Sequence, residues 1–193
     1  MSDVRNILLV GVGGQGIILA SDILTQAALN AGFDAKKSEI HGMSQRGGSV
    51  FSHVRYGRHV YSPVIPEGAA HILVALEEME ALRWLQYCGP QTELIVLQTR
   101  LNPANVKEYP DGVEAELRRL FTNIRAIDPA QLLEHSGGKK FINTAILGAL
   151  STGLDFPEKA WKDAIEKLAP AGTADLNWKA FAAGRSHYGG TTP

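Results

Sequence analysis

The sequence predicts an α/β protein, a three-layer sandwich around a mixed but mostly parallel sheet. Short apolar runs that suit buried strands, such as 7–10 and 71–76, alternate with longer segments of helical periodicity. A glycine-rich turn separates the first apolar run from the first helix. With 193 residues the chain can bury one such core, so we expect a single domain over 1–186 and a flexible tail over 187–193.

The chain opens with a strand followed by a helix. The apolar run 7–10 is predicted to be a buried strand. The helix is expected from Gly16 to about Asn30, because apolar residues recur along one face, and Gly32 is well placed to end it. A second strand is predicted over 33–40, which begins the alternation of an α/β fold.

A hairpin is predicted next. Residues 50–56 alternate between two faces, 57–58 fit a two-residue turn, and 59–62 would return antiparallel. The predicted sheet is mixed for this reason. We expect His53 and His59, on the two strands of the hairpin, to lie at the surface.

The second half of the chain continues the alternation. A strand over 71–76 leads into a helix with three acidic residues at its start, Glu77, Glu78 and Glu80, which we expect to be solvated. Strands are predicted over 93–98 and 123–127, with a loop from 98 to 112 between them. Further helices are predicted over 129–135, over 139–152, from about 157, and over 177–184.

Composition argues against several classes of function. A formal net charge of −1 gives no electrostatic case for nucleic acid or an acidic membrane, and no apolar run approaches the length of a membrane span. No signal peptide is visible, so we expect the chain in the cytoplasm. The single cysteine, Cys88, cannot by itself hold an iron–sulfur cluster or a structural zinc ion. The histidines are scattered, and no metal site is predicted.

The glycine-rich turn is the first candidate site. Its glycines have the spacing of the dinucleotide-binding fingerprint of Rossmann-like folds. Glycine lets the backbone approach a bound group, and the helix N-terminus offers N–H donors to a phosphate or carboxylate. A tight turn without any ligand needs the same glycines, so both interpretations stay open. The candidate cofactor-binding residues here are Gly11, Gly13, Gly14, Gln15 and Gly16.

A second polar, glycine-rich segment spans 41–49. Arg46 could hold a carboxylate or phosphate through two parallel hydrogen bonds, and His41 could donate a hydrogen bond or move a proton near neutral pH. These two are the candidate catalytic residues. The alternative is a polar loop whose side chains only cap neighbouring elements. The candidate cofactor-binding residues of this segment are Ser44, Gln45, Gly47 and Gly48.

The two glycine-rich segments are expected to form one site. Both follow predicted strands, and ligands of such sheets bind beyond the carboxyl ends of the strands. Asn143 and Thr144 could hydrogen-bond to the glycine turn or lie on a helix surface. An NAD enzyme is less well supported, because Lys36 and Lys37 precede Glu39, the residue in the ribose-binding position, and no hydride-transfer site is evident.

Four segments in order resemble the gamma-type domain of 2-oxoacid:ferredoxin oxidoreductases. They are Gly-Val-Gly-Gly-Gln-Gly-Ile at 11–17, Glu-Ile-His-Gly-Met-Ser-Gln-Arg-Gly-Gly at 39–48, Tyr-Ser-Pro-Val-Ile-Pro-Glu-Gly at 61–68 and Asn-Thr-Ala-Ile-Leu-Gly-Ala-Leu-Ser at 143–151. The resemblance covers nearly the whole chain. The joint occurrence of the segments is specific, although no single one of them is.

The resemblance implies an enzyme subunit that is inactive alone. The family oxidatively decarboxylates 2-oxoacids with coenzyme A, giving an acyl-CoA, carbon dioxide and reduced ferredoxin. Thiamine diphosphate, magnesium and the [4Fe–4S] clusters are expected in a large (alpha) subunit, and coenzyme A is a co-substrate. This chain is expected to bind no cofactor alone. Its expected partners are the large subunit and, through the complex, ferredoxin. A homodimer of the isolated chain is left open.

Within the family, an aryl pyruvate is the expected substrate and an aryl-acetyl-CoA the product. Pyruvate, 2-ketoglutarate and branched-chain oxoacids remain open. Two other classes of function also remain: a stand-alone nucleotide-binding protein, and a purely structural subunit whose loops contact only its partner.

Overall fold

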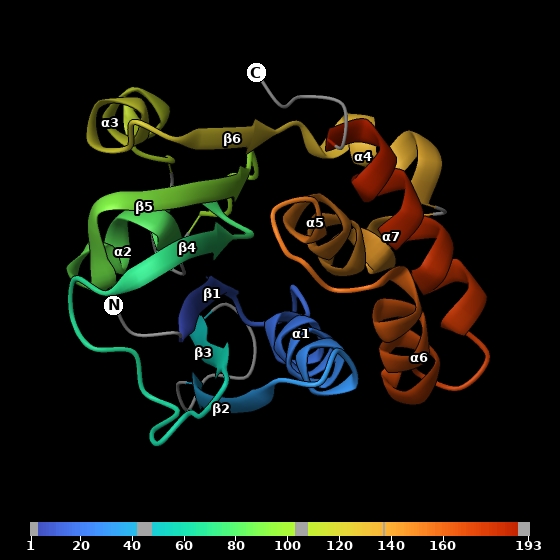
Figure 1. Cartoon of the computed structure of the whole chain (residues 1–193). Coiled ribbons are helices and arrows are strands. Elements are labelled where there is room, and N and C mark those ends of the chain that lie inside the picture. Colours follow the sequence, from blue (N-terminus) through green and yellow to red (C-terminus); the bar gives the residue numbers. More distant parts are fainter. Residues whose placement is uncertain (1–3, 42–47, 103–107, 137, 189–193) are drawn as a thin grey trace.

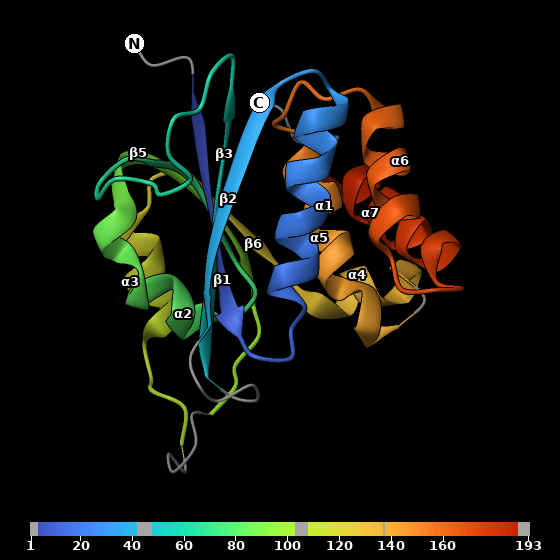
Figure 2. The same ribbon diagram turned by 90° about the horizontal axis from the view of Figure 1, so that it is seen from below.

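A central sheet separates two layers of helices in the computed structural model of the chain (Figure 2). The structure describes residues 4–41, 48–102, 108–136 and 138–188. Two helices, α2 (Glu78–Arg83) and α3 (Val113–Leu120), cover one face of the sheet (Figures 1 and 2). The helices on the other face are α1 (Ile17–Asn30), α4 (Pro129–Ser136), α5 (Ile142–Ser151), α6 (Glu158–Leu168) and α7 (Ala174–Tyr188). The predicted three-layer α/β sandwich is confirmed.

The sheet is mixed, with six strands in the order β2-β3-β1-β4-β5-β6 among the described residues. The strands are β1 (Arg5–Val12), β2 (Asp34–His41), β3 (Ser49–Gly57), β4 (Ala70–Ala75), β5 (Cys88–Leu97) and β6 (Ile124–Ile127). Strand β3 is antiparallel to both β1 and β2, whereas β1, β4, β5 and β6 are parallel. The carboxyl ends of β1 and β2 therefore lie at the same edge.

Helices cover both faces of the sheet, and successive side chains of a strand point to opposite faces. Side chains on both faces are therefore buried. In β1, Ile7 and Leu9 pack in the core beneath α1, α5 and α6, and Leu8 and Val10 pack in the core beneath α2 and α3. All four side chains are fully buried. This two-sided burial explains why β1 is an unbroken apolar run in the sequence.

Two helices of the larger layer, α5 and α7, touch through their backbones. A Cβ on Gly148 of α5 would lie 2.0 Å from the carbonyl oxygen of Phe181, and one on Gly184 of α7 would lie 1.9 Å from that of Ala145. Glycine is unfavourable inside a helix, by about 1 kcal/mol relative to alanine. Here it permits the close approach that places the start of α5 beside the glycine turn.

The predicted hairpin is wrong in its second strand. Residues 58–69 form a loop, and the antiparallel pairing of the sheet comes instead from β3 with its two neighbours, β2 and β1. Arg55 holds the loop by donating from Nη1 to the carbonyl oxygens of Ser62 at 2.8 Å and Val64 at 3.1 Å. The chain then crosses to β4, as Figure 1 shows.

His53 is buried, which corrects the expectation that it lies at the surface. Its ring is 2% exposed and makes an edge contact with Tyr87, at 5.0 Å between ring centroids. Its Nδ1 accepts a hydrogen bond from the backbone N–H of Ile65 at 3.2 Å. Burial lowers the pKa of His53, which favours the neutral ring. By contrast, His59 is exposed as expected.

Two elements near β5 also differ from the sequence prediction. The strand begins at Cys88, five residues earlier than predicted, and burial raises the pKa of the Cys88 thiol to about 11. A thiol with such a pKa is a poor nucleophile at neutral pH. Helix α3 lies in a stretch for which no helix was predicted.

Candidate functional site

The glycine turn lies between β1 and α1, as predicted. Gly14 and Gly16 have φ values of 101° and 79°, in the region that favours glycine. A Cβ on Gly16 would lie 2.4 Å from Nδ2 of Asn143, and one on Gly11 would lie 2.8 Å from Oε1 of Gln15. Gly11 and Gly16 therefore make room for two side chains that brace the turn.

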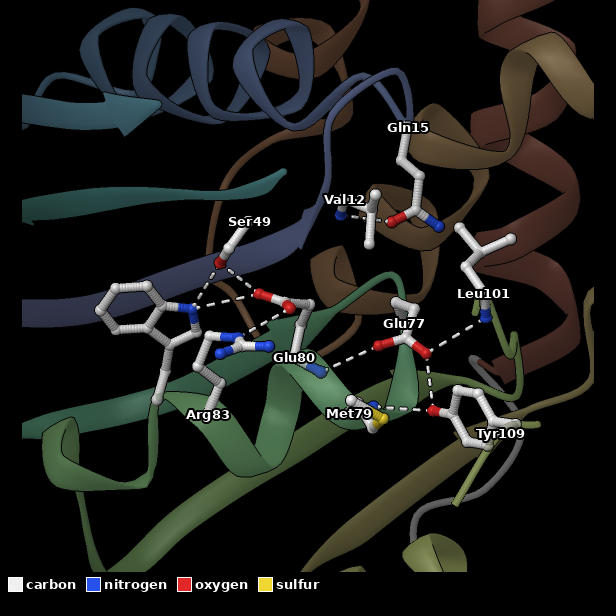
Figure 3. A network of polar contacts seen from close by, with 10 residues as sticks. Val12, Gln15, Ser49, Glu77, Met79, Glu80, Arg83, Leu101 and Tyr109 are labelled. Carbon is white, nitrogen blue, oxygen red and sulfur yellow. Dashed lines mark hydrogen bonds and ion pairs between the residues drawn. The ribbon is translucent and has the colours of Figure 1, made fainter. Parts of the chain in front are cut away.

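Gln15 braces the turn from within. Its Oε1 accepts a hydrogen bond from the backbone N–H of Val12 at 2.7 Å, as Figure 3 shows. Its Nε2 donates to the carbonyl oxygen of Leu76, also at 2.7 Å. Both ends of the amide are thus bound to the end of β1 and to the segment that follows β4. Sequence reasoning missed this structural use, and a contact between Gln15 and a cofactor stays a prediction.

Asn143 braces the turn from the other side. It stands in the first turn of α5, and its Nδ2 donates to the carbonyl oxygen of Gly16 at 3.1 Å. Thr144 does not share this role, because its hydroxyl donates to Oδ1 of Asn177 in α7 at 2.7 Å. Of the two side chains expected near the turn, only Asn143 contacts it.

The N-terminus of α1 offers donors to an anionic group. The helix spans 14 residues, its N-cap residue is Gly16, and no side chain among the described residues caps it. Uncapped N–H groups and the positive end of the helix dipole favour a phosphate or carboxylate at this place. Gly14, at the tip of the turn, is exposed, so the backbone is open to solvent here.

The second glycine-rich segment reaches the same edge. His41 ends β2, where its backbone pairs with Val50, and the backbone N–H of Gly13 donates to the carbonyl oxygen of Gly48 at 2.8 Å. The prediction that the two segments meet is confirmed at Gly13 and Gly48. The remaining candidates, Ser44, Gln45, Arg46, Gly47 and the side chain of His41, lie outside the described residues, and their roles stay predictions.

The acidic start of α2 is buried, which corrects the expectation of a solvated helix start. Glu77, Glu78 and Glu80 are 1%, 2% and 4% exposed. Glu77 is the N-cap residue of α2, and its Oε2 accepts a hydrogen bond from the backbone N–H of Glu80 at 2.9 Å. The helix dipole favours an acid at a helix start, but the residues that cover these acids come from other segments, so the local pattern could not reveal their burial.

The buried acids bind the segment that follows β5. Oε1 of Glu77 accepts hydrogen bonds from the Tyr109 hydroxyl at 2.6 Å and from the backbone N–H of Leu101 at 3.4 Å (Figure 3). Glu78 pairs with Arg100 at 2.9 Å. Burial raises the pKa of Glu77, and burial together with the neighbouring Glu77 raises the pKa of Tyr109. The tyrosine is therefore the proton donor of the pair.

Glu39, the residue in the ribose-binding position, is engaged in an ion pair. Its Oε2 lies 2.7 Å from Nζ of Lys37, which also pairs with Asp22 of α1. A carboxylate that holds a ribose must accept hydrogen bonds from the sugar hydroxyls instead. The arrangement weakens the NAD interpretation.

In the part of the chain that the structure describes, no group of three or more histidine, cysteine or acidic side chains is placed to hold a metal ion. No helix there is long and apolar enough to span a bilayer.

The fold and the glycine-rich edge define a Rossmann-like α/β domain, and sequence similarity identifies its family. Residues 6–187 match the family described as pyruvate ferredoxin/flavodoxin oxidoreductase, and the chain belongs to this family. It is 37% identical over 188 residues to the indolepyruvate oxidoreductase subunit IorB of Archaeoglobus fulgidus, covering 93% of this chain and 92% of the relative. The subunit of the same name from Thermococcus kodakarensis is 36% identical, with 93% of both chains covered.

Solved structures share the fold. The keto/oxoacid ferredoxin oxidoreductase gamma subunit from Geobacter sulfurreducens superposes with a TM-score of 0.70 at 25% identity, covering 96% of each chain. A 2-oxoglutarate:ferredoxin oxidoreductase from Magnetococcus marinus, solved with 2-oxoglutarate, coenzyme A and succinyl-CoA bound, gives 0.76 at 19% identity. That match covers all of this chain but only 32% of the longer one, so the fold of this chain also occurs as one part of a larger polypeptide.

Proposed function

We propose that the chain is the small (beta) subunit of an indolepyruvate:ferredoxin oxidoreductase. The complex would oxidatively decarboxylate aryl pyruvates with coenzyme A, giving an aryl-acetyl-CoA, carbon dioxide and reduced ferredoxin. The observation that carries the proposal is the identity of 36–37% to subunits of that name over nearly the full length of both chains. Its cytoplasmic location is part of the same proposal.

The metal-ligating side chains of this chain indicate which cofactors belong to the larger subunit. A [4Fe–4S] cluster needs four thiolates, and this chain has one cysteine, whose pKa is raised by burial. Such a cluster does not fit here, so we assign the clusters, thiamine diphosphate and magnesium to a larger subunit. The redox chemistry and the decarboxylation then belong to that partner, and this chain contributes a binding surface.

The glycine-rich edge suits the anionic part of a substrate. The uncapped N-terminus of α1 would hold a phosphate or carboxylate through backbone N–H groups, which supports coenzyme A or the oxoacid as the ligand. In this proposal the candidate residues of 11–16 and 41–48 meet the larger subunit near that ligand. His41 and Arg46 are the side chains that we assign to contact it.

Arg46→Ala in the reconstituted complex tests this assignment. Loss of a charge-assisted hydrogen bond should lower kcat/KM for coenzyme A or the oxoacid roughly tenfold or more, with the assembly and thermal stability unchanged. Arg119→Ala is the matched control, because Arg119 is exposed on α3 and pairs only locally with Glu116 among the described residues. Unchanged kinetics for both substrates would reject the role of Arg46.

One observation supports a second substrate class. The chain is also 30% identical over 185 residues to the 2-oxoglutarate synthase subunit KorC of Methanothermobacter thermautotrophicus. A panel of oxoacids should therefore include 2-oxoglutarate and pyruvate beside indolepyruvate. Titration of the isolated chain with NAD(H) and coenzyme A would identify the remaining alternative, a stand-alone nucleotide-binding protein.

A further inference from the structure

Helix α2 stands between the segment after β5 and the start of β3 and hydrogen-bonds to both. Its first residues follow the end of β4, beside the glycine turn, and Figure 3 shows polar contacts that leave it in two directions. One set runs to the segment after β5, and the other runs to the start of β3. A helix of six residues gains little stability by itself, so its partners fix its position.

The first arm joins α2 to the segment after β5. The Tyr109 hydroxyl donates to Oε1 of Glu77 at 2.6 Å and accepts from the backbone N–H of Met79 at 3.0 Å. The backbone N–H of Leu101 donates to the same Glu77 carboxylate at 3.4 Å. Two points of this segment, eight residues apart in the sequence, thus meet at one buried carboxylate.

The second arm joins α2 to the start of β3. The Ser49 hydroxyl donates to Oε2 of Glu80, and Nε1 of Trp84 lies 3.4 Å from the same oxygen. The other oxygen, Oε1, accepts from Nε of Arg83 at 2.9 Å. Ser49 directly follows Gly48, the residue whose carbonyl binds the glycine turn, so this arm ends at the candidate site.

The two arms share one hydrogen bond. The backbone N–H of Glu80 donates to Oε2 of Glu77 at 2.9 Å, so a continuous chain of contacts runs from Tyr109 through both carboxylates to Ser49. Burying carboxylates costs free energy, and a serine or threonine could cap α2 at a lower cost. Glu77 does more than a cap requires, because it also holds Tyr109 and Leu101. Glu80 in turn holds Ser49, the first residue of β3.

We infer that Glu77 and Glu80 are positioning residues, which fix the segment after β5 and the start of β3 relative to the glycine turn. The inference rests on the proposed function only for its effect on the KM for substrate. Neither carboxylate is assigned a contact with substrate. Their effect is to keep Leu101, Tyr109 and Ser49 in one arrangement relative to the glycine turn, so that less ordering remains to be done when substrate binds.

The kinetic test uses Tyr109→Phe, Ser49→Ala and the double variant in the complex with the larger subunit. Each single change removes one hydrogen bond from an arm, and we expect KM for coenzyme A or the oxoacid to rise roughly fivefold while kcat changes less than about twofold. The double variant should raise KM by less than the product of the single effects, because the arms share one chain. Ser49→Thr keeps the hydroxyl and should restore the wild-type KM.

Ser151→Ala is the matched control, since Ser151 is a buried serine at the far end of α5. It should leave KM unchanged. Unchanged KM in both single variants, or purely multiplicative effects in the double variant, would overturn the inference. So would a failure of Ser49→Thr to restore KM.

A second measurement needs no activity and so separates this inference from the proposed function. Hydrogen–deuterium exchange of the isolated chain is followed in peptides that cover 48–51. Tyr109→Phe should accelerate exchange there by roughly fivefold, although Tyr109 is remote in sequence. Faster exchange together with an inactive wild-type complex would support the positioning role and refute the function. Unchanged exchange at 48–51 would refute the positioning role.

Discussion

Gly16 shows how one residue can satisfy two constraints at once. Its φ of 79° suits the turn into α1, and the missing side chain leaves space for Asn143, whose Nδ2 would lie 2.4 Å from a Cβ. Gly14 meets only the first constraint, because a Cβ there would find no atom within 4 Å. A substitution at Gly14 therefore introduces backbone strain alone, whereas a substitution at Gly16 introduces both strain and a steric clash.

Alanine substitution at these two glycines should give different losses of stability. We expect Gly14→Ala to lower the free energy of unfolding by about 1 kcal/mol, from backbone strain alone. Gly16→Ala should lower it by about 2–4 kcal/mol, because Asn143 must also move. Denaturant unfolding of both variants measures the difference. Equal losses would mean that Asn143 does not brace the turn.

His53 should make stability depend on pH. Its pKa is lowered in the fold, so between that value and the ordinary 6.5 the unfolded chain binds more protons than the folded one. Stability should then fall as pH drops below 6.5, by up to about 1.4 kcal/mol per pH unit for this group.

His53→Asn should reduce this slope, since an amide oxygen can accept the Ile65 N–H bond without titrating. His71, whose pKa burial also lowers, should leave a remainder of the slope. The variant His59→Asn, at an exposed histidine, serves as control and should keep the full slope. Denaturant unfolding between pH 5 and 7.5 measures all three chains, and identical slopes would exclude a buried neutral His53.

At the residue scale, the sequence predicted backbone roles better than side-chain partners. The spacing of Gly11, Gly13 and Gly16 was enough to place the turn, because a strand-to-helix turn constrains the backbone locally. The burial of Glu77 and Glu80 was not predictable, since it depends on Tyr109 and Ser49, which are distant in sequence.

At the element scale, the contact between α5 and α7 is the most demanding. Gly148 and Gly184 allow backbone atoms to approach where any side chain would collide with a carbonyl group. This contact fixes the start of α5, from which Asn143 reaches the glycine turn. A substitution that moves α5 should therefore displace Asn143 at the glycine turn as well as disturb the core.

Gly184→Ala should push the two helices apart. A Cβ 1.9 Å from the carbonyl oxygen of Ala145 cannot be accommodated without backbone movement, so we expect a loss of about 2–3 kcal/mol or more. Gly153→Ala is the control, because its nearest neighbour would be 3.7 Å away, and it should change stability by less than about 0.5 kcal/mol. Thermal unfolding compares the two. A Gly184→Ala chain as stable as the control would contradict the close contact.

The elements that the sequence predicted correctly are those with strong local patterns. Strand β1 is an apolar run buried on both faces, and α1 has one apolar face and a glycine after its end. The return strand at 59–62 was wrong because a glycine-first turn also occurs where a loop begins, and Arg55 stabilises that loop instead. Helix α3 was missed, since it contributes only two buried side chains, Val113 and Leu117.

At the scale of the whole molecule, the sheet brings together segments that are far apart in the chain. The glycine turn, Gly48, the start of α2 and the segment after β5 meet at the carboxyl edge, as expected for an open α/β sheet. The edge that would carry the site was predictable from the sequence, because both glycine-rich segments follow predicted strands. The contacts that join its loops were not, because they are made by tertiary packing.

In the proposed function, this chain forms part of a catalytic site that is complete only with a larger partner. Ferredoxin reduction should be measured with indolepyruvate and coenzyme A for three samples: the purified chain, the larger subunit alone, and the two together. We expect turnover at the full rate only in the reconstituted mixture. Turnover by the purified chain alone, or a full rate from the larger subunit without it, would show that the two subunits do not share the site.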